Sequence, residues 1–343
     1  MAIFKIFPSK DATIRSEFPS KNEGLDEILE INSYRDLSGT AQVSRALLQF
    51  STEEINDLIT NKISGSQFDV YLKLYLANAE ELPVEYSLYC YPISQSWDMG
   101  TGRYSNSPET RNGVCWVSSS ISTRWSSSGG DFYSTPVASQ SFAYNDSKDI
   151  EFKVTNTINL ITSSIPNYGF IIKHSDSLEF ITGSQLILKY FSRDTHTIYP
   201  PCLEFRWNDF SYSTGSLSTV TSDEIVATLA NNKGEFQQDS IQKFRINVRD
   251  KYPTRIFQTS SIYTVNKLLP TASYWAIKDL DTEETVINFD ETYTKLSCDS
   301  QGNYFSLYMN GLEVERYYKI LIKTTINNST LVLDNNYYFK VVR

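Results

Sequence analysis

The sequence of 343 residues contains few of the side chains that mark an enzyme or a metal site. It has only two histidines, His174 and His196, and neither lies in a G-x-S-x-G or H-E-x-x-H motif. Its four cysteines are scattered without a C-x-x-C pair, so they predict small buried side chains rather than a zinc site or a disulfide framework. There is no glycine-rich phosphate loop and no EF-hand calcium loop. We therefore expect no catalytic residues, no metal and no cofactor.

Clusters of positive charge and long apolar runs are also missing. The net charge is −9 with a pI of about 4.9, and no Lys/Arg run offsets it, which disfavours nucleic acid as a partner. No apolar stretch approaches the roughly 18–20 residues of a membrane span, so we expect no membrane insertion. The N-terminal segment "MAIFKIFPSKDATI" alternates apolar and polar residues and lacks the apolar core of a signal peptide. It predicts a first strand, in a protein that is not exported by a standard secretion route.

Aromatic side chains and period-two alternation are abundant. The 23 Tyr, 19 Phe and 5 Trp favour strands, because these side chains fit a pleated, half-buried surface. Clusters of Gly, Ser, Asn and Asp separate the alternating segments, and many short strands with such turns are typical of all-β sandwiches and barrels. The segments predicted as strands are 68–78, 84–94, 149–161, 168–174, 184–192, 202–207, 243–250, 273–279, 303–309, 316–325 and 337–342.

Helix signals are rare, and one polar segment suggests a domain boundary. Residues 51–61, "STEEINDLITN", combine a cap at Ser51 or Thr52 with an acidic first turn and an apolar face. Residues 223–231, "DEIVATLAN", fit a helix or a strand equally well. The Ser/Thr/Gly-rich segment 208–224 divides the chain into predicted domains 1–208 and 209–343. About seven strand-like segments in the second domain predict a smaller immunoglobulin-like β-sandwich.

The tryptophans of the polar region 94–135 are the candidate contact residues. Trp97, Trp116 and Trp125 lie in or beside this region, which also contains Tyr104. Aromatic side chains on sandwich loops stack on sugar rings or contact protein partners. Large aromatics are usually mostly buried, so plugs that close the end of the sandwich are the weightier alternative.

Residues 188–209, "LKYFSRDTHTIYPPCLEFRWND", predict the closing strand of the first domain. We expect Arg193 to act structurally, by hydrogen bonding to backbone carbonyls or by pairing with Asp194 or another carboxylate. Pro200 and Pro201 end the preceding turn and set an extended entry into the strand.

The first 205 or so residues resemble the DNRLRE domain family, which is described as disaggregatase-related carbohydrate-binding modules. The resemblance implies a jelly-roll β-sandwich for the first domain. It rests on segments that occur in the family order, namely "KDATIRSEFPSKNEGLDEILEI" (10–31), "SRALLQFSTEEI" (44–55), "WDMGTGRYSN" with the later tryptophans, "NYGFIIKHSD" (167–176) and "FSRDTHTIYPPCLEFRW" (191–207).

The whole chain resembles uncharacterised virion structural proteins of contractile-tailed marine bacteriophages, and segments of the C-terminal half strengthen this resemblance. The resemblance implies a protein that assembles into a virion in the host cytoplasm, in several copies or as a homo-oligomer. The segments that carry it are "KFRINVRDKYPTRIFQTSSIY" (243–263), "LPTASYWAIKDLDTEETVINFD" (269–290), "TKLSCDSQGNYFSLYMNGLEVERYYKILIKT" (294–324) and "DNNYYFKV" (334–341).

Three functional hypotheses follow from these observations. The leading one is a non-enzymatic structural protein of a tailed bacteriophage, in the tail, neck or baseplate or on the capsid, which contacts other virion proteins. The alternative is a receptor-recognition module that binds a host-surface glycan through Trp97, Trp116, Trp125 or Tyr104. A glycan-cleaving enzyme is the third, because acidic turns such as 175–179 and 279–284 contain carboxylates.

Overall fold

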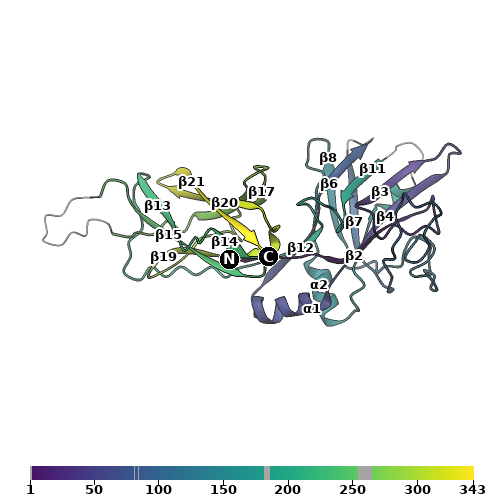
Figure 1. Cartoon of the computed structure of the whole chain (residues 1–343), viewed down its shortest axis with the longest axis horizontal. Coiled ribbons are helices and arrows are strands. Elements are labelled where there is room, and N and C mark those ends of the chain that lie inside the picture. The colour runs from purple at the N-terminus through teal and green to yellow at the C-terminus, as the bar shows by residue number, and fades with distance from the viewer. Residues whose placement is uncertain (1, 81, 84, 181–185, 254–264) are drawn as a thin grey trace. The chain divides into compact units, whose positions relative to one another are not determined.

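The computed structural model describes the chain except residues 1, 81, 84, 181–185 and 254–264 (Figure 1). The described residues form an almost entirely β structure with a few short helices, which confirms the predicted all-β sandwich class. No helix in the described ranges is long and apolar enough to cross a membrane.

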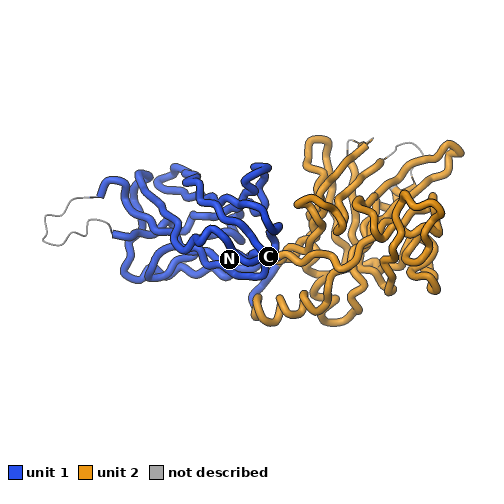
Figure 2. Tube along the Cα trace, viewed as in Figure 1, with its two compact units in different colours: residues 1–4, 66–68, 206–343 blue, residues 5–65, 69–205 orange. Residues whose placement is uncertain are grey.

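The chain divides into two compact units (Figure 2). The N-terminal unit comprises residues 5–65 and 69–205, and the C-terminal unit comprises residues 206–343 together with 1–4 and 66–68. The short segments 1–4 and 66–68 therefore group with the C-terminal unit, although the sequence analysis assigned them to the first domain. Strand pairing explains this, because β1 (Ala2–Ile6), β12 (Cys202–Trp207) and β5 (Phe68–Leu74) are successive neighbours in one sheet, and each has residues in both units. The jelly-roll and immunoglobulin-like subtypes stay predictions.

Two sheets make up the N-terminal unit. One has the strand order β1-β12-β5-β9, and the other has the order β6-β11-β3-β4-β10-β7-β8, with β2 also paired to β4. The strands are β1 (Ala2–Ile6), β2 (Pro8–Arg15), β3 (Ile28–Arg35), β4 (Ala41–Phe50), β5 (Phe68–Leu74), β6 (Leu76–Glu80), β7 (Glu85–Pro92), β8 (Ala138–Ala143), β9 (Ile150–Lys153), β10 (Phe170–His174), β11 (Leu186–Phe191) and β12 (Cys202–Trp207).

The short helices of this unit partly follow the sequence signals. Ser51 caps α1 (Thr52–Asp57), as expected, by accepting a hydrogen bond from the backbone N–H of Glu54, and a π-helical segment, η1 (Leu58–Ile63), continues it. The strand predicted over 149–161 is wrong beyond Lys153, where α2 (Thr155–Ser163) begins. There the buried positions Val154, Ile158 and Ile161 have helical spacing, which competes with the period-two pattern before them. A single helical turn, α3 (Asp176–Glu179), follows β10.

The eight-stranded sheet is covered on one of its faces by the connection between β7 and β8, residues 93–137, hereafter the long loop. Ile14, Leu47 and Ile171 of three sheet strands form a buried cluster with Trp97 and Trp125 of the long loop. The long loop therefore has a core of its own, and this core fixes the surface that the loop presents.

The C-terminal unit contains two further sheets, with the orders β13-β15-β19-β18 and β14-β21-β20-β16-β17. Segment 223–231, for which helix and strand were both open, is a strand. A short 3-10 segment, η2 (Met309–Gly311), follows β19. The strands are β13 (Ile225–Ala230), β14 (Glu235–Gln237), β15 (Ile241–Asp250), β16 (Ser273–Asp279), β17 (Thr285–Ile287), β18 (Ser297–Asp299), β19 (Gly302–Tyr308), β20 (Tyr317–Ile326) and β21 (Ser329–Val342).

Stacked aromatic side chains fill the core of the C-terminal unit. Trp275 stacks on Phe305 with ring centroids 4.8 Å apart, and Phe305 stacks on Phe244 at 5.3 Å. All three side chains are buried. The four cysteines are free and buried, as predicted: Cys90, Cys115, Cys202 and Cys298.

Candidate functional site

Asn22 anchors the long loop to the turn between β2 and β3. Its buried side-chain amide donates hydrogen bonds to the carbonyl oxygens of Met99 (2.7 Å) and Val114 (2.9 Å). Its side-chain oxygen accepts a hydrogen bond from the backbone N–H of Gly102 at 2.7 Å. One side chain thus holds three separate points of the loop and leaves none of its polar atoms unsatisfied.

Glycines allow the loop to approach Asn22 this closely. A Cβ atom on Gly100 would lie 2.3 Å from the Asn22 side-chain oxygen, and one on Gly102 would lie 2.2 Å from its backbone oxygen. Gly113 has no room for a Cβ because the Gly100 backbone lies in the way, at 2.5 Å. The glycines of "GTGRYSNSPETRNG" are therefore packing requirements, whereas the sequence alone marked this segment only as a turn cluster.

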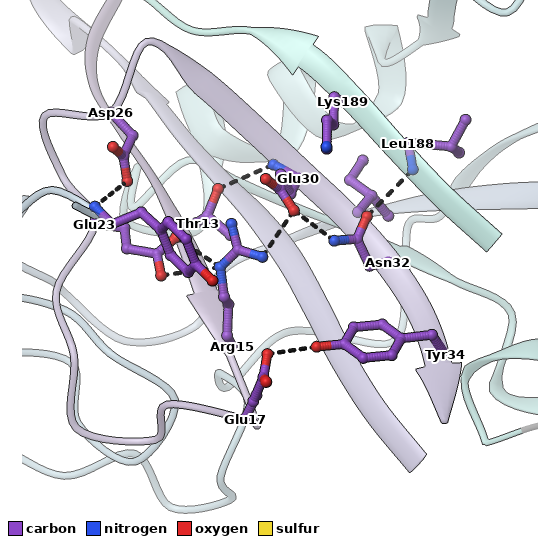
Figure 3. A network of polar contacts seen from close by, with 12 residues as sticks. Thr13, Arg15, Glu17, Glu23, Asp26, Glu30, Asn32, Tyr34, Leu188 and Lys189 are labelled. Atoms are coloured by element: carbon purple, nitrogen blue, oxygen red, sulfur yellow. Dashed lines mark hydrogen bonds and ion pairs between the residues drawn. The ribbon is translucent and has the colours of Figure 1, made fainter. Parts of the chain in front are cut away.

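A buried ionic network centred on Arg15 includes Glu23, the residue that follows Asn22 in the chain (Figure 3). The Arg15 guanidinium donates from Nε to both carboxylate oxygens of Glu23 at 2.9 and 2.8 Å, and from Nη1 to Glu30 at 2.7 Å. Asn32 links Glu30 to the neighbouring strand, since its amide donates to Glu30 and its oxygen accepts from the backbone N–H of Leu188. Arg15 joins β2, β3 and the turn between them, and Asn32 extends the network to β11.

The three carboxyls around Arg15 differ in their affinity for a proton. Burial raises the pKa of Glu23 to about 7, against the opposing effect of the Arg15 guanidinium. Burial acts in the same direction on Glu30, but the hydrogen bond and charge of Arg15 prevail and the pKa of Glu30 is lowered. Burial also raises the pKa of Asp26. At Glu23 the cost of burying the charged carboxylate outweighs the stabilisation by Arg15, so its proton is bound more tightly than in water.

Tyr104 is the one predicted contact residue that is well exposed, with 49% of its surface accessible. The amine of Lys21 lies 4.4 Å from its ring centroid, and the guanidinium of Arg15 lies 4.8 Å from it. Its backbone N–H donates to Asp26 at 2.8 Å. Cation–π contacts and the backbone bond therefore hold this exposed ring in a fixed position.

The tryptophans occupy other positions. Trp97 and Trp125 are buried, and their indole N–H groups donate to the carbonyl oxygens of Tyr168 (2.8 Å) and Cys115 (2.9 Å). Their proposed role as surface contacts is corrected accordingly, because a buried indole has no free face for a ligand. Trp116 is half-buried, with the Arg45 guanidinium 5.1 Å from its ring.

Arg193 makes the structural contacts that the sequence analysis named. Its side chain donates to the carbonyl oxygen of Ser9 and lies 3.7 Å from Asp194. Its backbone N–H also donates to Asp11, whose pKa burial raises to about 7. Pro200 and Pro201 immediately precede β12, at the predicted entry to the closing strand.

A second buried ionic cluster joins β4, β10 and α3. Glu179 accepts two hydrogen bonds from Arg45, at 2.9 and 2.8 Å, and lies 2.9 Å from the Lys173 amine. The neighbouring His174 is fully buried, and burial lowers its pKa to about 4. His174 is therefore a neutral side chain inside the sheet, and the charges of Arg45, Lys173 and Glu179 beside it are paired with one another. Within the ranges that the structure describes, no three His, Cys, Asp or Glu side chains group in a way that would hold a metal.

An open groove of about 640 Å³ crosses β7 between β8 and the start of α3. Tyr89 lines it, and Tyr91, the next residue on the same side of the strand, stacks with Tyr89 at a centroid distance of 6.3 Å. The groove lining also includes the carboxylates of Glu85 and Asp146. No local sequence signal marks this groove, because its walls come from segments far apart in the chain.

Comparisons with known proteins give no family. No family model and no curated protein matches the chain. The resemblance to the DNRLRE family therefore stays a prediction.

Solved structures show only faint likenesses. A DUF4785 family protein from Legionella pneumophila is 8% identical, with a TM-score of 0.18, and the chain covers 98% of itself and 65% of that protein. The Parabacteroides merdae β-glucuronidase is 11% identical (TM-score 0.17; 96% of this chain and 36% of that one). The tripod from the baseplate of bacteriophage Tuc2009 is 9% identical (TM-score 0.16; 98% and 91%). The chain spans less than two thirds of the first two, and scores this low carry no argument about fold or function.

Proposed function

We propose that this protein is a non-enzymatic structural component of a tailed bacteriophage virion, assembled in the host cytoplasm, and that it contacts other virion proteins or further copies of itself. The virion assignment rests on the resemblance of the chain to virion structural proteins. The observation that best supports a contact role is Tyr104, an exposed ring fixed on a rigid, internally bonded loop. Tyrosines held in this way bind partners with little loss of conformational entropy.

Particle composition tests the virion assignment. Particles purified from the phage that encodes this chain should contain it at a fixed copy number, by quantitative mass spectrometry and by particle reconstruction. Its absence from intact particles would overturn the assignment.

A matched pair of variants tests the contact role. Tyr104→Ala should reduce incorporation into particles, whereas Tyr144→Ala, at another exposed tyrosine, should not. Equal incorporation of both variants would remove Tyr104 from the contact surface.

The β7 groove favours glycan binding as a second candidate function. It combines an aromatic platform at Tyr89 with hydroxyl and carboxylate groups, and sugar rings stack on aromatic faces while their hydroxyls bond to such groups. Tyr89→Ala should abolish binding on a glycan array, with Tyr252→Ala, at an exposed tyrosine of the C-terminal unit, as the control. Binding that survives Tyr89→Ala would exclude this groove.

A further inference from the structure

The β7 groove is rich in groups that both donate and accept hydrogen bonds. The hydroxyls of Ser87 and Ser141 lie 2.9 Å apart across the β7–β8 pair, and those of Ser175 and Ser177 lie 3.1 Å apart at the start of α3. Each hydroxyl that bonds to a second hydroxyl keeps further donor or acceptor capacity. Ligand hydroxyls also donate and accept hydrogen bonds, so this lining fits a polyhydroxylated ligand.

The side chains around the groove carry more negative than positive charge. Glu85 and Asp146 line it, and the described residues of its lining include no Lys, Arg or His. The nearby amine of Lys148 is used by the β8–β9 turn, where it donates to the carbonyl oxygens of Ala143 (2.5 Å), Tyr144 (3.0 Å) and Asp146 (2.8 Å).

The charge of Lys173, near the groove, is neutralised by two carboxylates. Lys173 is buried and pairs with Asp176 at 2.5 Å and with Glu179 at 2.9 Å. The surrounding unit adds to the negative field, since the N-terminal unit contains 16 Lys and Arg against 24 Asp and Glu. An acidic ligand in the groove would therefore meet like charge without a cation to bind it.

We propose that the β7 groove selects neutral and amine-bearing oligosaccharides against acidic ones, with Glu85 and Asp146 as the residues that set this selectivity. The proposal rests on the glycan-binding candidate function. It adds to that function the charge class of the ligand and the two side chains that determine it.

Three oligosaccharides of equal length test the selectivity: one of N-acetylglucosamine, its de-N-acetylated amine form and one of galacturonic acid. Calorimetry with the full chain at mildly acidic pH and low salt should give tighter binding of the amine form than of the acidic form by about tenfold, with the neutral form between them. The difference should shrink at high salt. Glu85→Gln with Asp146→Asn should bring the three affinities together while neutral binding is retained.

The outcomes separate the selectivity from the binding function. Glu53→Gln removes an exposed carboxylate on α1 and should leave the affinity order unchanged. Acidic sugars that bind as tightly as the amine form, or an order that survives Glu85→Gln with Asp146→Asn, would overturn the selectivity but leave glycan binding intact. No binding of any of the three oligosaccharides would overturn both. Loss of all binding on Tyr89→Ala alone would support the groove itself.

Discussion

Asn22 and Arg15 each hold several segments together, so single residues carry much of the organisation of the N-terminal unit. Asn22 satisfies backbone groups at three points of the long loop, and Arg15 bonds to two glutamates that follow it in the chain, one in the turn between β2 and β3 and one in β3. Both side chains are buried. Loss of such a side chain leaves buried partners unsatisfied, which costs more than the bond itself contributes.

Asn22→Ala should lower the free energy of unfolding of the N-terminal unit by roughly 2–4 kcal/mol, because it leaves two carbonyls and one N–H without their partner. Urea denaturation measures this loss. Asn61→Ala is the control: Asn61 is exposed and bonds only to Asp57, so its removal should change stability by no more than about 0.5 kcal/mol. Equal effects of the two variants would contradict the anchoring role of Asn22.

Glu23 and Asp11 should make the protein more stable at pH 5 than at pH 8. Burial raises both pKa values from their ordinary range near 4 to about 7. A group that binds its proton more tightly in the folded state stabilises the folded protein. This contribution is complete below the pKa of the group in the unfolded chain, and it is lost as pH rises through its pKa in the folded protein. The lowered pKa of His174 acts in the opposite direction below about pH 6.5, but the two carboxyls outweigh one imidazole, so thermal unfolding should show a midpoint that falls between pH 5 and 8.

Neutral variants identify the groups responsible for this slope. Glu23→Gln and Asp11→Asn mimic the protonated forms, and together they should remove the fall between pH 5 and 8 and leave the rise that His174 produces below about pH 6.5. A fall that persists in the double variant would assign it to other groups.

At the scale of elements, the edge strand β13 is protected by side chains of a different sheet. The carbonyl oxygen of Ala227 accepts hydrogen bonds from the Asn335 amide at 3.0 Å and the Tyr337 hydroxyl at 3.1 Å, both from β21. A bare strand edge invites pairing with another chain. Here the Asn335 and Tyr337 side chains form a polar cap that bonds to the Ala227 carbonyl on this edge.

Asn335→Ala combined with Tyr337→Phe should destabilise the C-terminal unit by about 1–3 kcal/mol and increase self-association, since both bonds to Ala227 are lost and its carbonyl is freed. Chemical denaturation and light scattering against concentration measure the two effects. Tyr338→Phe removes a hydroxyl from an adjacent, exposed ring and should be neutral. A monomeric double variant would show that the cap serves stability alone.

At the scale of the whole molecule, each compact unit has a core of its own. Trp275 and Phe305 belong to the core of the C-terminal unit, and Trp97 belongs to a buried cluster of the N-terminal unit. Their apolar contacts are therefore made within one unit, although β1 and β12 run through both.

Phe305→Leu and Trp97→Phe should each speed amide hydrogen exchange mainly in their own unit, because each change weakens one core only. Exchange followed by mass spectrometry locates the effect along the chain. Faster exchange spread equally over both units would show that the two unfold as a single cooperative body.

The all-β class, the capped helix at 51–61 and the buried cysteines follow from the sequence by itself. These features depend on local period, on local capping chemistry and on composition, all of which are visible in a single chain segment. The helix after Lys153 was missed because two periodicities meet there, and only the packing of Ile158 and Ile161 selects one of them.

Tertiary structure alone decided which aromatic side chains are available for contact. Trp97 and Trp125 are buried while Tyr104 is exposed, and the sequence gives all three the same polar, glycine-rich surroundings. The Arg15 network and the β7 groove likewise join residues from strands and turns that are distant in the chain. Charge pairing and burial across such distances depend on how the strands are paired, and strand pairing is a property of the folded sheet rather than of any one segment.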